Sequence, residues 1–364
     1  MEIYLFNPEH DLALANGTPL YTPTPTAKAL RRDLRLLPMW YAPAGSYVLG
    51  EEEDREWLAR MDREHGLGVE LVTKKELRGM SDAVIRPWGW NHALRKELIK
   101  AGLAESCLKT PEELDKIREL SHRRLTVKFH QRLREMPGIG EMPPEPIEAT
   151  TIDEVRQYVN SHPYCFIKKP YSGSGRGVYR TYEGFNRPME QWCVGALREQ
   201  GSVMCEPGYG KMMDFAVEYD CRNGKPNLIG LSVFMTDMHN QYKRGFVAHD
   251  RLLQALIMRQ EVEVAAAIVA TQKPVAEELC PYYDGYVGVD MMLYADQTTG
   301  LTKVNPCVEV NVRATMGVVT CGLAEKFKVR DMREFKIISP ADLTGDETQL
   351  TPVYADTSYV AVMM

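Results

Sequence analysis

The segment that most constrains the fold of this chain is a glycine-rich loop, Ser172 to Gly177, that joins two strand-like runs. The run before it, residues 165–169, ends in two lysines, and the run after it, residues 177–181, again has the pattern of a strand. Three glycines at alternate positions allow backbone N–H groups to converge on an anion. The pattern predicts a hairpin that closes over nucleotide phosphates while a lysine pairs with them, although a plain glycine-rich turn has the same composition.

Other phosphate-binding loops do not fit this pattern. A P-loop has lysine and then serine or threonine after its last glycine, where this chain has Val178. A dinucleotide-binding loop opens a helix, whereas the residues after Gly177 are strand-like. A protein-kinase loop is followed by its lysine on a later strand, whereas here the lysines come first. The order of strand, lysine, loop and strand is therefore the informative feature.

A second cluster of polar residues lies on a predicted hairpin within residues 286–313. Alternate residues of a strand share one face, so Glu309, Asn311 and Arg313 should project together. Folding the hairpin about its turn brings Asp290 roughly opposite Glu309. Carboxylate and amide oxygens suit Mg²⁺, and an arginine can hold a phosphate or a carboxylate through two hydrogen bonds. The alternative is an exposed hairpin face with ordinary polar residues.

A third segment is less specific. Residues 202–206 form an apolar strand that ends in Glu206, and a loop then leads to a strand that begins at Asp214. Such a strand end could accept a hydrogen bond from the amino group of adenine, and the Asp214 carboxylate could accept from ribose hydroxyls. An ordinary strand and loop would have the same sequence pattern. This segment therefore indicates a nucleotide site only in combination with the glycine-rich loop and the polar hairpin.

Strand and helix signals alternate over residues 1–108, which predicts a small parallel α/β domain. A mainly helical connector follows. From Cys165 onward, long strands joined by hairpin-like turns predict an α+β layout dominated by antiparallel sheet, with helical segments near residues 188–200 and 251–280. At roughly 150 residues per domain, 364 residues correspond to about two to three domains.

Composition argues against several classes of function. The net charge is −6, with 44 Lys and Arg against 50 Asp and Glu, whereas a protein that coats nucleic acid normally carries a basic surplus. No run approaches about eighteen uncharged apolar residues, which argues against a membrane span. The N-terminus lacks the pattern of a signal peptide, and the eight cysteines form no CxxC pair. We therefore expect a cytoplasmic protein with reduced thiols and without nucleic-acid or membrane partners.

Together these segments resemble the ATP-grasp superfamily across roughly residues 125–316. The matching motifs are Ile167-Lys168-Lys169-Pro170 with the loop at 172–177, then Glu206, then Gly288-Val289-Asp290, and finally Glu309-Val310-Asn311-Val312-Arg313. The resemblance implies a parallel α/β pre-grasp domain followed by an ATP-grasp fold with antiparallel sheets. The implied boundaries are 1–108 for the pre-grasp domain, 109–200 for the helical connector and first subdomain with its lid, 201–330 for the second subdomain with the adenine hinge and metal site, and 331–364 for a C-terminal extension.

The resemblance also implies a role for each matching residue. Lys169, which precedes the proline, would contact the ATP phosphates, and Arg313 would face the reacting phosphate, so that both act in catalysis. The other nucleotide contacts would come from the lid, the adenine hinge and the ribose side: Ser172, Gly173, Ser174, Gly175, Gly177, Glu206 and Asp214. The metal ligands would be Asp290, Glu309 and Asn311. Further phosphate contacts could come from Arg124 or Lys128, in the helical connector before the glycine-rich loop, and from Lys243 or Arg244 on a later strand.

The implied activity is that of an ATP- and Mg²⁺-dependent ligase, for which Mn²⁺ would also serve. Such an enzyme activates a small-molecule or peptide carboxylate as an acylphosphate and joins it to an amine, or sometimes a thiol, with release of ADP and phosphate. Two alternatives stay open: phosphoryl transfer to a small molecule, and a nucleotide-binding module without ligase turnover. The loops at residues 7–11 and 86–92 each follow a strand, where α/β domains place ligand loops. Either loop could touch the acceptor substrate or simply form a turn.

Overall fold

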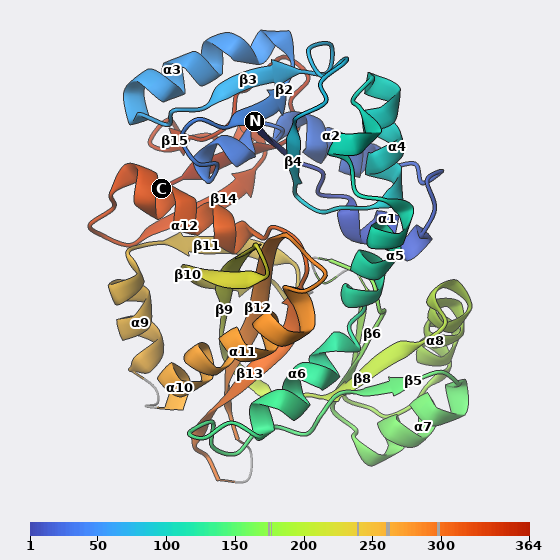
Figure 1. Ribbon diagram of the computed structural model, residues 1–364. Coiled ribbons are helices and arrows are strands. Elements are labelled where there is room, and N and C mark those ends of the chain that lie inside the picture. The colour runs from blue at the N-terminus through green and yellow to red at the C-terminus, as the bar shows by residue number, and fades with distance from the viewer. Residues whose placement is uncertain (174, 176, 239, 260–262, 297–298) are drawn as a thin grey trace.

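The structure is a computed structural model that describes residues 1–173, 175, 177–238, 240–259, 263–296 and 299–364. The described chain forms three β-sheets, of which one is parallel and two are antiparallel. Figure 1 shows the parallel sheet at the top of the molecule, the small antiparallel sheet at the lower right and the large antiparallel sheet between them. This arrangement confirms the predicted combination of an α/β and an α+β part.

The longest strands belong to the large antiparallel sheet, whereas the strands of the other two sheets are short. The strands are β1 (Glu2–Leu5), β2 (Tyr47–Gly50), β3 (Glu70–Thr73), β4 (Val84–Pro87), β5 (Ile147–Ala149), β6 (Cys165–Lys168), β7 (Val178–Thr181), β8 (Val203–Pro207), β9 (Gly210–Arg222), β10 (Lys225–Thr236), β11 (Tyr242–Val247), β12 (Gly285–Ala295), β13 (Thr302–Asn311), β14 (Arg333–Ile338), β15 (Thr348–Gln349) and β16 (Val360–Met363). The helices are α1 (His10–Asn16), α2 (Pro25–Asp33), α3 (Arg55–His65), α4 (His92–Ala101), α5 (Pro111–Leu120), α6 (Leu125–Arg134), α7 (Ile152–Ser161), α8 (Arg187–Gln200), α9 (Asp250–Met258), α10 (Glu263–Ala270), α11 (Gln272–Pro274) and α12 (Met316–Phe327).

The parallel sheet has the strand order β3-β2-β1-β4. Because β1 and β4 are parallel neighbours, their carboxyl ends meet at the same edge of the sheet. Asn7 Nδ2 donates a hydrogen bond to Gly89 O at 2.8 Å across that edge. The two loops singled out in the sequence, at residues 7–11 and 86–92, therefore lie against each other.

The small antiparallel sheet has the order β5-β8-β6-β7 and holds the glycine-rich loop between β6 and β7. One face packs against α7 and α8 through buried side chains that include Cys165, Ile167 and Cys205. Side chains alternate between the two faces of a strand, so Lys168 and Glu206 lie on the opposite face. That face looks toward the large sheet and carries the charged side chains of Lys168 and Glu206.

The large sheet has the order β13-β12-β9-β10-β11-β14-β16-β15. On one face, β9, β12 and β13 bury apolar side chains such as Val217, Val289 and Val310 in a core shared with α6, α9 and α10. The opposite face of the same strands is polar and includes Asp290 and Glu309. A sheet that is apolar on one side and polar on the other thus positions the predicted metal ligands.

The C-terminal residues 331–364, in which the sequence shows no motif, extend this large sheet. β14 pairs with β11 and with β16, and β15 pairs with β16. The predicted helical segment at 251–280 contains α9, α10, α11 and a π-helical turn (Val275–Leu279), and Pro274 is the last residue of α11. None of the described helices is both long enough and apolar enough to cross a membrane.

Candidate nucleotide and metal site

Asp290 on β12 and Glu309 on β13 stand directly opposite each other in the antiparallel register, which confirms the pairing predicted from the hairpin. Asn311 lies two residues further along β13, opposite Gly288, and so shares the same face. Burial, and then the negative charges of Glu309 and Glu218, raise the pKa of Asp290 well above its usual value. Three carboxyl groups therefore crowd one face of the sheet, where a cation would stabilise their ionised forms.

This donor set fits Mg²⁺. In proteins Mg²⁺ usually takes one or two carboxylates and fills its other positions with phosphate and water oxygens. Within the described residues, no group of three or more His, Cys, Asp or Glu side chains is arranged to hold a metal ion. A metal held by Asp290, Glu309 and Asn311 would thus depend on oxygens brought by a ligand such as a triphosphate.

Arg123 joins the glycine-rich loop to this cluster. Its side chain is buried, its Nη2 donates to Glu309 Oε1 at 2.7 Å and its Nη1 donates to Ser172 Oγ at 2.7 Å. The sequence favoured Arg124 or Lys128 as the basic residue of this segment, but neither is buried, and Arg124 pairs with a glutamate on β5. Arg123 is thus the residue of this basic run that points inward, and the turn into α6 decides which side chain does so.

The two lysines before the loop point to opposite faces of the small sheet. Lys168 is buried and its ammonium group contacts the Glu206 carboxylate. Lys169 Nζ lies 2.6 Å from Glu199 Oε2 on α8 and over the ring of Trp192. The structure therefore brings Lys168 to the face that looks toward the large sheet, and not Lys169 as the sequence suggested. The alternation of side chains along β6 is the reason, so we transfer the proposed phosphate contact to Lys168.

The glycine-rich loop is folded back on itself. Lys169 N donates to Gly177 O at 2.8 Å, and a side chain at Gly177 would collide with Ser172 Oγ. Gly175 adopts a φ of +71°, a left-handed conformation that favours glycine. Ser174, another predicted lid residue, lies outside the described residues. The closeness of the loop ends thus explains Gly177, and the left-handed backbone explains Gly175.

Glu206 and Asp214 lie where the chain passes from the small sheet to the large one. Glu206 is on β8 and contacts Lys168. Asp214 is on β9, where it shares the polar face with Glu218 four residues later, and its Oδ2 accepts a hydrogen bond from Lys211 Nζ at 2.6 Å. Their contacts with adenine and ribose stay predictions.

The later basic pair, Lys243 and Arg244 on β11, lies apart from the carboxylate cluster. Lys243 is exposed. Arg244 Nη1 donates to Glu334 Oε1 at 2.6 Å on the neighbouring strand β14. We therefore assign neither residue to the site.

Glu218 belongs to the site although the sequence did not single it out. It is 1% exposed, lies opposite Gly288, and accepts hydrogen bonds from Ser232 Oγ at 2.9 Å and Thr315 Oγ1 at 2.8 Å. Burial raises its pKa to about 7, and the two hydrogen bonds offset this only in part. A side chain at Gly317 would collide with its carboxylate. The signal in the sequence was a glutamate within the otherwise apolar run at residues 215–219 of β9.

This buried carboxyl group predicts a pH-dependent stability. Its pKa is about 7 in the folded protein against an ordinary value of 4.5, so the folded state binds the proton more tightly. The stabilising contribution is complete below about pH 4.5 and is lost as the pH rises through about 7, by up to about 3 kcal/mol. We expect the free energy of unfolding to fall less between about pH 5 and 8 in Glu218→Gln than in the wild type. Urea unfolding at several pH values checks this, with surface Glu190→Gln as the control, and equal slopes would contradict the assignment.

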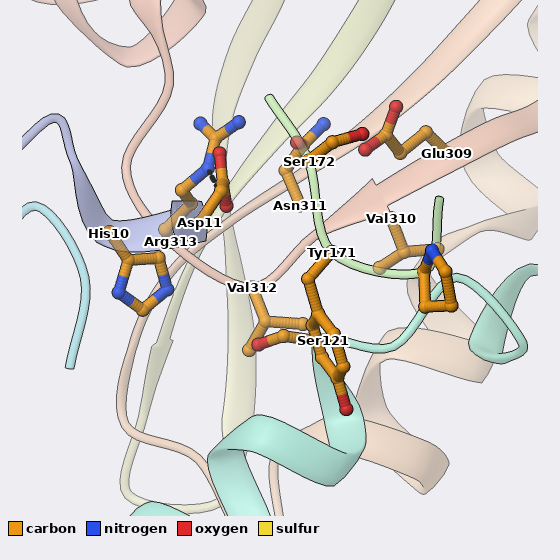
Figure 2. Close-up of a pocket in the computed structure, with 11 residues that line it drawn as sticks. His10, Asp11, Ser121, Tyr171, Ser172, Glu309, Val310, Asn311, Val312 and Arg313 are labelled. Atoms are coloured by element: carbon orange, nitrogen blue, oxygen red, sulfur yellow. Dashed lines mark hydrogen bonds and ion pairs between the residues drawn. The ribbon is translucent and has the colours of Figure 1, made fainter. Parts of the chain in front are cut away.

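A small pocket lies beside the carboxylate cluster (Figure 2). Its walls include residues 10–11 of the parallel domain, residues 170–172 of the glycine-rich segment and residues 309–313. Arg313 Nε donates to Asp11 Oδ1 at 3.1 Å, and Arg313 Nη1 donates to Ala314 O at 3.0 Å. Arg313 thus lies next to the predicted metal ligands, and its acidic partner comes from a segment 302 residues away in the sequence.

Known structures with the same arrangement show what fold this is. A biotin carboxylase–β-γ-ATP complex from Campylobacter jejuni matches with a TM-score of 0.51 at 10% identity, over 100% of this chain and 86% of that chain. An ADP complex of N5-carboxyaminoimidazole ribonucleotide synthetase matches with a TM-score of 0.50 at 12% identity, over 100% and 91%. Carboxyaminoimidazole ribonucleotide synthase from Aspergillus clavatus, complexed with ATP, matches with a TM-score of 0.50 at 14% identity, over 89% and 94%. No family model matches the sequence, and no curated protein matches it either.

Proposed function

We propose that this chain, which shares the ATP-grasp fold of those carboxylase and synthetase structures, is an ATP- and Mg²⁺-dependent ligase. It would activate a small-molecule or peptide carboxylate as an acylphosphate and join it to an amine, with release of ADP and phosphate. The observation that carries the proposal is the facing pair of Asp290 and Glu309 with Arg123 and Arg313 beside it. Such an arrangement suits phosphoryl transfer, in which catalysis is mostly positioning and charge neutralisation.

The charges on the two sheets support a nucleotide ligand between them. The small sheet presents Lys168, a cation suited to phosphates, and Glu206, an acceptor suited to the amino group of adenine. The large sheet presents Asp290 and Glu309 on the face that Arg123 reaches. The three similar proteins were crystallised with β-γ-ATP, ADP and ATP.

Asp290, Glu309 and Asn311 are the residues that would hold Mg²⁺. A bound Mg²⁺ would neutralise negative charge on the β- and γ-phosphates of ATP. Arg123 holds Glu309 on one side and the lid at Ser172 on the other, so it couples lid position to the metal ligands. A closed lid would keep water away from the acylphosphate.

The proposed reaction has two steps. First, a carboxylate oxygen of the acid attacks the γ-phosphorus of ATP, the bond from that phosphorus to the bridging oxygen breaks, and ADP leaves. Next, the amine nitrogen attacks the acyl carbon, the C–O bond to phosphate breaks, and phosphate and one proton leave. Lys168 and Arg313 would stabilise the negative charge on the transferred phosphoryl group.

Product analysis tests this function. Purified protein is incubated with MgATP and a panel of carboxylic acids and amines, ADP release is measured, and products are identified by mass spectrometry. We expect ADP, phosphate and an amide in equal amounts. A stable phosphorylated acceptor as the only product would instead identify a phosphotransferase, and MgATP binding without turnover would identify a binding module.

A further inference from the structure

Two cysteine side chains touch each other in the core that lies against the apolar face of the large sheet. Cys221 is on β9, Cys280 directly follows the π-helical turn, and their Sγ atoms are 3.1 Å apart. All eight cysteines of the chain are free thiols. Within the part of the chain that the structure describes, no other two of them lie within hydrogen-bonding distance of each other. The contact therefore singles out one pair of thiols.

The geometry of this pair suits a disulfide. An S–S bond is about 2.05 Å long, so the two sulfur atoms need to approach each other by only about 1 Å. Both residues lie at the ends of their elements, where backbone opens most easily. Cys221 is the last residue but one of β9, and Cys280 N closes the π-helical turn by donating to Val275 O at 3.1 Å. Such turns are rare and are frequently found at functional sites.

The two thiols differ in acidity and in access. The hydrogen bond with Cys221 lowers the pKa of Cys280 below its usual value, although burial opposes this. The same hydrogen bond, and then burial, raise the pKa of Cys221. Cys280 is 5% exposed and is followed by the exposed residues Pro281 and Tyr282, whereas Cys221 is completely buried. Because the thiolate is the reactive form of cysteine, Cys280 is the thiol that meets an oxidant first.

We propose that Cys221 and Cys280 are a site of reversible oxidation, at which hydrogen peroxide forms an intramolecular disulfide. First, the Cys280 thiolate attacks one peroxide oxygen, the O–O bond breaks, hydroxide leaves, and Cys280 becomes a sulfenic acid. Next, the Cys221 sulfur attacks the Cys280 sulfur, the S–O bond breaks, and water leaves with the proton of Cys221. In sum, two thiols lose two hydrogen atoms and one peroxide is reduced to two waters. This inference does not depend on the proposed ligase function.

The disulfide would fasten together two segments that hold the parallel domain. It would join positions 59 residues apart in the sequence. Next to one thiol, Arg222 Nη1 donates to Glu2 Oε1 at 2.9 Å on β1. Near the other, Asp284 Oδ1 accepts from Arg86 Nη1 at 2.7 Å on β4. The bond would form on the apolar face of β9, so it would leave the carboxylates on the opposite face uncovered.

Peptide mapping tests the proposal. The full chain is treated with a series of hydrogen peroxide concentrations, remaining thiols are alkylated in urea, and tryptic peptides are identified by mass spectrometry. We expect peptide 212–222 to be joined to peptide 260–303, and dithiothreitol to release both. The oxidised protein should melt at least about 3 °C above the reduced protein, because the cross-link restricts the unfolded chain. Cys280→Ala should abolish the link and the shift, whereas Cys107→Ala, the matched control at a half-buried cysteine, should retain both.

A second variant tests the order of the two steps. Cys221→Ala should stop the reaction at the sulfenic acid, so dimedone, which reacts with sulfenic acids, should label Cys280. Labelling of Cys221 in Cys280→Ala, with none of Cys280 in Cys221→Ala, would overturn the assignment of Cys280 as the attacking thiol.

Three results with the wild type would overturn the site itself, even if an alanine variant were unstable. One is that these two peptides become joined only after the protein has been unfolded in urea. Another is that a different pair of cysteines is joined at a lower peroxide concentration. The third is that Cys280 is converted to its sulfinic acid without any link to Cys221.

Discussion

Replacing Glu309 by glutamine should lower ATP turnover by at least about 100-fold. The change removes one of two carboxylates that face each other across β12 and β13, and leaves Asp290 as the only charged ligand of the proposed metal set. Glutamine has a similar size and keeps an acceptor for Arg123, so the fold should be retained. Steady-state ADP release over a series of MgCl₂ concentrations measures the effect, which should include a weaker dependence on added Mg²⁺.

The chain offers a close control for this experiment. Glu148 accepts from Arg124 Nη2 at 2.8 Å, much as Glu309 accepts from Arg123 Nη2 at 2.7 Å, but Glu148 lies on β5. Glu148→Gln should leave turnover within about twofold of the wild type. Without nucleotide, Glu309→Gln should melt close to the wild type, because the lost ion pair with Arg123 is offset by relief of the repulsion from Asp290. Wild-type turnover in Glu309→Gln would show that the metal is not held here.

Local patterns predicted much of the fold and the core of the site. Within the predicted helical connector, α5 begins with a capping box between Thr110 and Glu113, which the sequence can signal because capping involves groups only three residues apart. α6 (Leu125–Arg134) also lies within that connector. Asp290 and Glu309 face each other because the period of two and a single turn determine the partners across a hairpin. Interactions within one element or one hairpin were therefore predictable.

The residues that the sequence missed owe their roles to contacts over long distances along the chain. Arg123 reaches Glu309 across 186 residues, and Thr315 reaches Glu218 across 97. The periodicity of a helix or a strand does not reveal a contact between residues so far apart in the sequence. The short strands β5 and β14 were missed for the same reason, because they pair with the distant strands β8 and β11. The inward turn of His10 likewise depends on the loop that follows β4.

Lys168→Met should lower kcat/KM for ATP by about 100-fold, whereas Lys169→Met should change it by less than about threefold. The two lysines are adjacent and chemically identical, and only the alternation of faces along β6 separates them. Lys168 faces Glu206 and the space between the sheets, while Lys169 pairs with Glu199 on the outer helix α8. Steady-state kinetics with varied ATP measures both variants under one set of conditions.

The two variants together show which of the two lysines contacts the phosphates, even if one variant is unstable. Lys168→Met leaves the half-buried Glu206 without its cation, which costs stability. Adding Glu206→Gln to Lys168→Met removes that unpaired charge, so the double variant should melt later than the single one and still show a low kcat/KM. A large loss in Lys169→Met with near-normal kinetics in Lys168→Met would return the phosphate contact to Lys169. It would also mean that Lys169, which lies just past the end of β6, leaves Glu199 on α8 when the nucleotide binds.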